Sequence, residues 1–292
     1  MTELKLKEGM VSVPGGNVWY CVVGENGGIP LLLLHGGPGA SSGYLETLLA
    51  LADERPIVLY DQLGGGKSDR PDDDELWTME RYAEEIYHVR QALHLDRVHI
   101  FGTSGGCLLA TDTYLAYPTG IISLILASPL LNIPLYTDTV LPELIAEMPE
   151  EHQITFANHL AHDEGMTPEY QAVINEYNNR YASRHPLPDS FINAFSDFNW
   201  RIREVMWGPD VLIPTGPFAH YDRTEQLATV KIPVLLTCGR YDSTTPMYLE
   251  WHKQQFPNAE TAVFEHSGHL HFLEESEEYN RVLRDFLKKV EE

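Results

Sequence analysis

Residues 97–118 read RVHIFGTSGGCLLATDTYLAYP, and Ser104 at their centre follows an apolar run and precedes a helical pattern. The glycines at 102, 105 and 106 leave room for a sharp turn, where larger side chains would clash with a strand and a helix. A nucleophile raised on a strand–turn–helix has this Gly-x-Ser-x-Gly spacing. The stretch therefore predicts that Ser104 is a nucleophile rather than a small residue of a glycine-rich loop.

Short apolar runs recur around this stretch, and helical patterns separate them. A hairpin is expected at residues 10–23, and apolar runs with their following loops lie at residues 29–39, 55–69, 96–106, 121–129 and 232–242. Apolar runs without alternation are typical of strands buried on both faces of a parallel sheet. Residues 78–93 have a helical pattern, and alternation of strands and helices predicts an α/β sheet with crossover helices.

The alternation stops at about residue 130, where the chain becomes polar and helical, and the strand pattern resumes at residue 232. We expect a helical cap of residues 130–224, inserted into a core domain of residues 1–129 and 225–292. Aromatic and apolar residues of this insertion form either the core of the cap or an acyl pocket: Trp200, Met206, Trp207, Phe218 and Tyr221.

The composition narrows the class of protein. Of 292 residues, 43% are hydrophobic, enough for a sizeable core. The net charge of −23, from 43 acidic residues against 20 Lys and Arg, disfavours binding to nucleic acid and to anionic membranes. The first ten residues lack the apolar stretch of a secretory leader, and no apolar run approaches the roughly 20 residues of a membrane span. The three cysteines have neither disulfide nor metal-ligand spacing. We expect a cytoplasmic protein that acts on a small molecule or short peptide.

A glycine-rich segment, HGGPG at residues 35–39, follows the apolar run before it. Acyl transfer passes through an oxyanion, which preorganised N–H groups stabilise. One N–H normally comes from the residue after the nucleophile, here Gly105, and the other from a loop after an earlier strand. We expect Gly37 to supply the second N–H; the alternative is a plain turn.

Two further candidates for chemistry follow strand patterns near the end of the chain. Asp242, in TCGRYDSTTP at residues 237–246, can hold an imidazole in the required tautomer or simply cap a turn. FEHSGHLHFLEE at residues 264–275 contains His266, His269 and His271, of which His269 is best placed as a general base. The three histidines could also bind a metal, but no second cluster of ligands completes such a site, and we expect neither metal nor cofactor.

The order Ser104, Asp242, His269 is the chain order of nucleophile, acid and base in the α/β-hydrolases. In the expected mechanism, His269 removes the proton of Ser104 as it attacks an acyl carbon. An Asp nucleophile, as in an epoxide hydrolase or dehalogenase, is disfavoured because serine occupies that position. A relative that binds a ligand without turnover is the remaining alternative, and an intact triad argues against it.

Six segments together resemble the proline iminopeptidases and tricorn-interacting aminopeptidases, a serine peptidase branch of the α/β-hydrolases. They are LLLLHGGPGASSGYL (31–45), LYDQLGGGKSDRP (59–71), VHIFGTSGGCLLA (98–110), MWGPD and TG (206–216), GRYDSTTP (239–246) and HSGHLHFLEESEEYNRVLRDFL (266–287). The resemblance covers nearly the full length. It implies an α/β-hydrolase fold with a mostly parallel eight-stranded sheet and a helical cap between strands six and seven. It also implies a triad of Ser104, His269 and Asp242, with Gly37 and Gly105 as oxyanion donors.

The resemblance also implies how the substrate amine is bound. Members that remove an N-terminal residue hold its amine with two glutamates, and the matching positions here are Val211 and Ser243. A buried ammonium without a carboxylate is costly, so either a cap acid substitutes (Asp210, Glu204 or Asp197) or the substrate lacks the amine. The candidate substrate contacts are Trp207, Asp210, Val211, Ser243 and Glu204.

Two substrate classes follow from these observations. The first prediction is an aminopeptidase that releases N-terminal proline or small apolar residues from short peptides or amino acid amides. The second is an amidase, esterase or lactonase whose acyl group carries no free amine. The full-length resemblance favours the first class, and the two missing glutamates favour the second.

Overall fold

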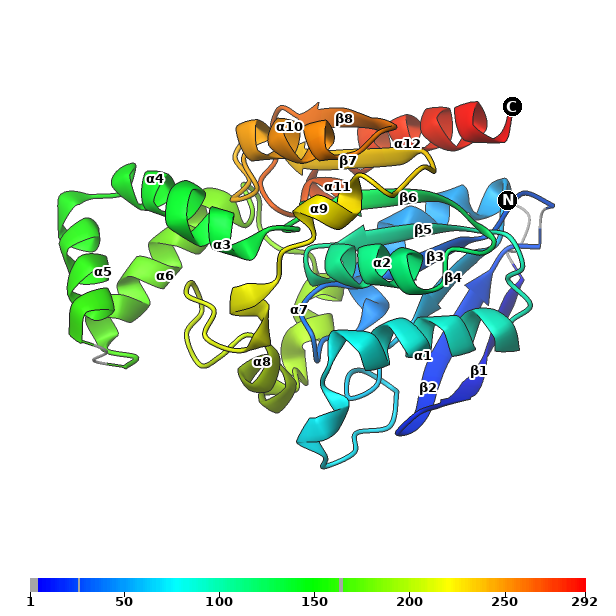
Figure 1. Cartoon of the computed structure of the whole chain (residues 1–292), viewed down its shortest axis with the longest axis horizontal. Coiled ribbons are helices and arrows are strands. Elements are labelled where there is room, and N and C mark those ends of the chain that lie inside the picture. Colours follow the sequence, from blue (N-terminus) through cyan, green and yellow to red (C-terminus); the bar gives the residue numbers. More distant parts are fainter. Residues whose placement is uncertain (1–4, 26, 163–164) are drawn as a thin grey trace.

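The structure, a computed structural model, describes residues 5–25, 27–162 and 165–292 (Figure 1). The first four residues, on which part of the leader prediction rests, lie outside the described residues. In the described chain, one eight-stranded sheet forms the centre of the molecule. Its strands are β1 (Leu6–Val13), β2 (Gly16–Val23), β3 (Leu31–Leu34), β4 (Ile57–Tyr60), β5 (Val98–Thr103), β6 (Ile121–Ala127), β7 (Val234–Gly239) and β8 (Ala259–Phe264).

The strand order is β1-β2-β4-β3-β5-β6-β7-β8. Strands β1 and β2 form the expected antiparallel hairpin, and β2 pairs antiparallel with β4. All other neighbours are parallel. The prediction of a mostly parallel α/β sheet is therefore confirmed, and the carboxyl ends of β3, β5, β6 and β7 meet at one edge.

The apolar runs of the central strands are buried on both faces of the sheet. In β3, Leu32 and Leu34 pack into one core cluster, whereas Leu31 and Leu33 pack into the cluster on the opposite face. All four leucines are fully buried. A strand covered on both sides needs no polar alternation, which explains why the runs are continuous.

Helices cover both faces of the sheet. Residues of α1 (Met79–Ala92), α2 (Gly105–Ala116) and α10 (Pro246–Gln255) pack into the first cluster. Residues of the 3₁₀ segment η1 (Ser42–Asp53) and of α12 (Ser276–Glu291) pack into the second. Among the helices of the described residues, none is long and apolar enough to cross a membrane.

Between β6 and β7 the chain leaves the sheet and forms a helical cap (Figure 1). Its elements are α3 (Ile133–Leu135), η3 (Tyr136–Val140), α4 (Leu141–Ala146), α5 (Glu150–His162), α6 (Pro168–Tyr181), α7 (Asp189–Ser196), α8 (Trp200–Met206), η4 (Pro217–His220) and α9 (Thr224–Leu227). Helices α4 to α6 pack around a third apolar cluster, to which Tyr248 of α10 also belongs. The division at residues 130 and 224 stays a prediction.

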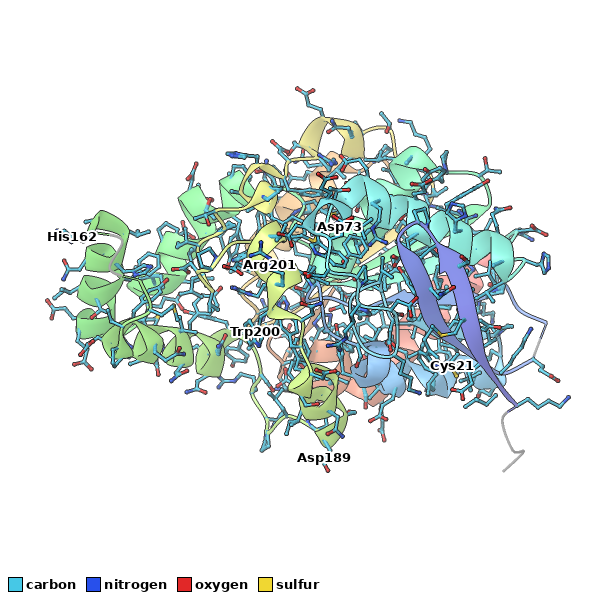
Figure 2. All side chains as sticks on the ribbon, turned by 90° about the horizontal axis from the view of Figure 1, so that it is seen from below. Cys21, Asp73, His162, Asp189, Trp200 and Arg201 are labelled. Carbon is cyan, nitrogen blue, oxygen red and sulfur yellow. The ribbon has the colours of Figure 1, made fainter. Side chains whose placement is uncertain are left out.

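The part of the cap that contains α7 and α8 is bonded to the core. The N–H of Asn199 donates to the carbonyl of Gly39 (3.0 Å), and the N–H of Ser41 donates to the carbonyl of Ala194 (3.2 Å). Figure 2 shows Arg201 of α8 beside the loop that contains Asp73, and Arg201 Nε donates to Oδ1 of Asp74 (3.0 Å). The two backbone bonds hold α7 and α8 over the loop of residues 35–39.

Candidate active site

Ser104 occupies a tight turn between β5 and α2. Its backbone has φ 52° and ψ −121°, outside the regions that non-glycine residues favour, and its N–H donates to the carbonyl of Ala127 (2.9 Å). A Cβ on Gly102 would overlap with the Gly106 carbonyl, and one on Gly106 with the Leu34 carbonyl. The glycines on either side of Ser104 therefore allow the turn to pack directly against its neighbours.

The loop that follows β3 lies directly over this turn. A Cβ on Gly36 would lie only 2.6 Å from the carbonyl oxygen of Thr103. Gly37 has a φ of +63°, and its nitrogen lies 3.5 Å from the position that a Cβ on Gly105 would occupy. Gly105 is the first residue of α2, so its N–H has no acceptor within the helix. The two expected oxyanion donors are thus neighbours beside Ser104.

A buried histidine holds this loop in place. His35 Nε2 accepts a hydrogen bond from the N–H of Gln62 (3.2 Å), and Gln62 Nε2 donates to the carbonyl of His35 (2.9 Å). Burial lowers the pKa of His35, although the nearby Asp61 carboxylate opposes this shift. The imidazole is therefore the neutral acceptor that the Gln62 N–H requires.

His269 and Asp242 form a close pair at the ends of β8 and β7. His269 Nδ1 lies 2.8 Å from Asp242 Oδ1. The Asp242 side chain is fully buried, whereas 24% of the His269 side chain is exposed. Burial lowers the pKa of His269, but the Asp242 carboxylate outweighs this effect and the pKa lies above its ordinary value. The structure thus presents an imidazole oriented by a buried carboxylate.

Asp242 has additional partners that hold it ionised. Ser128 Oγ donates to Asp242 Oδ2 (2.6 Å), and the N–H of Thr244 donates to Oδ1 (2.9 Å). Burial raises the pKa of Asp242, but its attraction to and hydrogen bond with His269, together with the Ser128 bond, leave the pKa below its ordinary value. Sequence reasoning missed Ser128, although its position after β6 at the same sheet edge was an available signal.

The other two histidines of the segment have different surroundings. His271 is fully buried, and its Nε2 lies 2.8 Å from Thr237 Oγ1. Burial lowers the pKa of His271 to about 4. His266 is exposed. Of the three histidines, it is His269 that reaches the pocket with Ser104.

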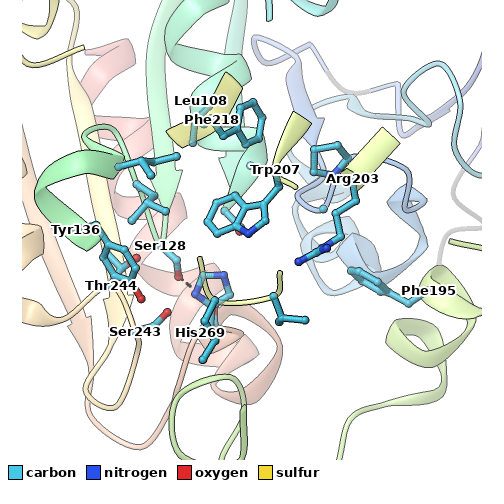
Figure 3. Close-up of a pocket in the computed structure, with 18 of the residues that line it drawn as sticks. Leu108, Ser128, Tyr136, Phe195, Arg203, Trp207, Phe218, Ser243, Thr244 and His269 are labelled. Carbon is cyan, nitrogen blue, oxygen red and sulfur yellow. Dashed lines mark hydrogen bonds between the residues drawn. The ribbon is translucent and has the colours of Figure 1, made fainter. Parts of the chain in front are cut away.

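The pocket at this sheet edge has a volume of about 530 Å³ (Figure 3). It brings together the expected Ser104, His269, Gly37 and Gly105 with three of the expected substrate contacts, Trp207, Val211 and Ser243. Its other lining residues are Pro38, Leu108, Ser128, Leu130, Ile133, Tyr136, Tyr177, Phe191, Phe195, Phe198, Trp200, Arg203, Leu212, Phe218 and Thr244. Met206 and Tyr221, in contrast, are buried in the core.

Two residues predicted as substrate contacts, Asp210 and Glu204, lie outside this lining, so a contact with the substrate stays a prediction for them. Asp210 is buried and engaged elsewhere: Oδ2 lies 2.7 Å from His159 Nε2, and Oδ1 accepts from the hydroxyl of Tyr170 (3.0 Å). Oδ1 also accepts from the N–H groups of the residues at 212 and 213, so this carboxylate organises the cap. Glu204 is on the surface and pairs with Arg201 (3.1 Å).

Asp197, the third acid considered, is also at the surface. Its carboxylate lies 2.8 Å from Arg70, and 84% of its side chain is exposed. Among the described lining residues the pocket contains no Asp or Glu. None of the three acids therefore lines the pocket where the two glutamates were expected.

A cluster of hydroxyl groups lies where the second glutamate was expected. The hydroxyls of Tyr136 and Tyr177 are 2.5 Å apart, and both interact with the hydroxyl of Ser243. Burial raises the pKa of both tyrosines, so they stay neutral. Sequence reasoning missed both tyrosines, because their positions in η3 and α6 depend on how the cap folds.

Comparisons with known proteins show the family to which the chain belongs. Residues 29–276 match the family model of the alpha/beta hydrolase fold. The chain is 40% identical over 286 residues to a proline iminopeptidase of Heyndrickxia coagulans, covering 97% of this chain and 99% of the relative. It is 34% identical over 291 residues to a proline iminopeptidase of Lactobacillus crispatus, covering 97% and 99%.

Solved structures give the same result. The crystal structure of a proline iminopeptidase from Mycobacterium smegmatis has a TM-score of 0.90 at 27% identity, over 97% of this chain and 98% of that chain. The crystal structure of VinJ also has a TM-score of 0.90 at 27% identity, over 97% and 99%. The chain belongs to the α/β-hydrolase fold family and, within it, to the proline iminopeptidase family.

Proposed function

We propose that this protein is a serine hydrolase that cleaves amide bonds through Ser104, His269 and Asp242. The observation that carries the proposal is the pairing of His269 with the buried Asp242 in the pocket that Ser104 enters from its strained turn. A strained turn of this kind persists only where the surrounding structure enforces it, and such turns are found at functional sites. The family relationship supports the same chemistry.

The residues have distinct roles in the proposed reaction. His269 accepts the proton of Ser104 as the serine oxygen attacks the substrate carbonyl carbon. The N–H groups of Gly37 and Gly105 stabilise the oxyanion of the tetrahedral intermediate. His269 then protonates the leaving amine. In the second half of the reaction His269 removes a proton from water, which attacks the acyl carbon, and His269 returns this proton to the Ser104 oxygen as the acyl group leaves. Asp242 keeps the His269 tautomer and stabilises its charged form.

The finer proposal is an aminopeptidase that releases proline or small apolar residues from the N-terminus of short peptides or amino acid amides. The names of the relatives and the cap over the pocket support it, because a covered pocket of about 530 Å³ favours short substrates. We place the substrate amine at the hydroxyls of Tyr136, Tyr177 and Ser243, which can accept its hydrogens.

A second candidate is an amidase, esterase or lactonase whose acyl group has no free amine. The observation that favours it is the absence of a carboxylate from the described pocket lining. A bound ammonium would have no ion-pair partner there, which makes its desolvation costly. The relatives favour the first candidate, so the requirement for the amine is the property to measure.

The deciding experiment compares proline, alanine and phenylalanine amides with and without N-acetylation, alongside simple esters. Faster cleavage of the unblocked amides supports the aminopeptidase, and equal or faster cleavage of the acetylated substrates supports the second candidate. Ser104→Ala is expected to abolish turnover while keeping the fold. A fluorophosphonate probe should label the wild type but not this variant; a wild type that is not labelled at Ser104 would instead be a binding protein.

A further inference from the structure

One cation lines the pocket outside the proposed catalytic residues. Arg203, on α8, is the only Lys or Arg among the described lining residues. Figure 3 shows its guanidinium between the side chains of Trp207 and Phe195, pointing toward the centre of the pocket. The surrounding lining is mostly apolar and aromatic, so this cation is partly withdrawn from water.

The guanidinium is held firmly in this position. Its Nη1 donates to the carbonyl of Gly208 (3.0 Å), and its Nη2 donates to the carbonyl of Asp210 (2.6 Å). These bonds leave the Nε–H and one N–H of each terminal nitrogen for other acceptors. An arginine that is anchored by backbone carbonyls loses little further freedom when it binds a ligand.

The charge of Arg203 is not neutralised by a carboxylate in an ion pair among the described residues. The acid whose charge acts on Arg203 is Asp210, and the carboxylate oxygens of Asp210 are occupied by His159, Tyr170 and two backbone N–H groups. Burial lowers the pKa of Arg203, and the Asp210 charge only partly opposes this effect. A partly buried cation without a directly paired carboxylate favours an anionic ligand.

We propose that Arg203 binds the C-terminal carboxylate of a dipeptide or tripeptide substrate. A short peptide carries a carboxylate at its C-terminus, in the part that leaves when the N-terminal residue is removed. A planar guanidinium can bind a carboxylate with two charge-assisted hydrogen bonds. Short peptides with a free carboxylate are therefore better substrates than the same peptides with an amide at that end. This inference rests on the proposed peptidase function and adds how the enzyme recognises the leaving part of its substrate.

The test compares L-prolyl-L-alanine with L-prolyl-L-alaninamide. In the wild type, kcat/KM for the free acid is expected to exceed that for the amide roughly tenfold or more. In Arg203→Gln the ratio falls to about one, and in Arg203→Lys it is intermediate because the charge stays and the planar fork is lost. Arg201→Gln, on the same helix but at the surface, keeps the wild-type ratio.

A wild-type ratio near one, or a ratio that persists in Arg203→Gln, would overturn the role of Arg203. If neither peptide is cleaved, the peptidase proposal fails. A binding measurement then tests separately whether Arg203 binds a carboxylate. Calorimetry then compares 3-phenylpropanoate with 3-phenylpropanamide. The carboxylate is expected to bind roughly tenfold more tightly to the wild type but not to Arg203→Gln; equal affinities in the wild type, or a difference retained in Arg203→Gln, would rule the site out.

Discussion

Ser128 Oγ donates a 2.6 Å hydrogen bond to Oδ2 of Asp242, the carboxylate oxygen that does not face His269. Both oxygens of this buried carboxylate are therefore bonded. A hydrogen bond to a charged group contributes ~1.5–3 kcal/mol. Ser128 thus stabilises the charged form of Asp242, on which the orientation and basicity of His269 depend.

Ser128→Ala is expected to lower kcat by about tenfold, because the Asp242 charge loses one of its hydrogen bonds. Steady-state kinetics with a proline amide measures the effect. Ser128→Gly is the matched variant: it also lacks the hydroxyl, but it relieves the positive φ of 56° at this position. The two variants should share the loss of activity and differ in Tm. Wild-type kcat in both would show that the hydroxyl does not support Asp242.

The pH dependence of kcat/KM should report His269 as a general base. Since the Asp242 carboxylate raises the pKa of His269 above the ordinary 6.5, the acid limb of the profile should have its midpoint above pH 6.5. In Asp242→Asn the limb should move to lower pH, and kcat should fall by roughly 10⁴-fold. An acid limb that stays in place in this variant would mean that another group titrates.

The glycines of the Ser104 turn should differ in their tolerance of a side chain. Gly102→Ala is expected to lower Tm strongly, because its Cβ would overlap with the backbone of Gly106. Gly105→Ala, in contrast, places its Cβ at ordinary contact distance, 3.5 Å from the nearest atoms, and should keep Tm within a few degrees. Thermal unfolding followed by circular dichroism separates the two. Equal Tm values would contradict the close packing of the turn.

Replacement of the two acids that were expected in the pocket should have different effects on stability. Asp210→Ala leaves His159, Tyr170 and two backbone N–H groups without their acceptor and should cost ~2–4 kcal/mol in the free energy of unfolding. Glu204→Gln should change neither stability nor KM, because the exposed pair with Arg201 contributes little. Urea unfolding and kinetics measure both. A raised KM for unblocked substrates in Glu204→Gln would restore its role in amine binding.

The free energy of unfolding should already decrease at pH values well above those at which the carboxylates are protonated. Burial lowers the pKa of three histidines, His99, His252 and His271, to about 4. The unfolded chain binds these protons at about pH 6.5 and the folded chain does not, so stability falls as pH drops from 6.5 toward 4. Asp242, whose folded pKa is lowered, loses its contribution only at lower pH.

Tm measured between pH 6.5 and 4.5 checks this expectation. His252→Gln should show a smaller decrease over this range, whereas the exposed His220→Gln should match the wild type. A constant Tm across the range would mean that the three histidines are protonated without cost. The raised pKa of His269 gives a stabilisation that is fully present below about pH 6.5 and is lost only at higher pH, so it does not change across this window.

The sheet was predictable because its signals are local. An apolar run such as residues 31–34 is continuous only when both faces of the strand are covered, and the glycine spacing around Ser104 depends on contacts within one strand–turn–helix. Asp242 and His269 each follow a strand pattern, so the topology brings them to one edge of the sheet. Their pairing follows from chain order and fold class together.

The pocket wall was less predictable because it depends on packing within the cap. Asp210 looked available, but its carboxylate binds the N–H groups of residues 212 and 213, an Asx-type turn that short polar side chains favour. Tyr136 and Tyr177 meet although they are distant in sequence. Arg203 resembled any surface cation of a helix until its neighbours were in place.

The bond between the N–H of Asn199 and the carbonyl of Gly39 limits how this enzyme can acquire new substrates. A Cβ on Gly39 would also lie only 2.5 Å from the carbonyl oxygen of Asn199, so the two backbones have no space between them. Lengthening the chain between α7 and α8 would displace the loop that carries Gly37. We therefore expect specificity to change through exchanges of single side chains that line the pocket, such as Arg203 and Val211, and not through insertions or deletions in this part of the cap.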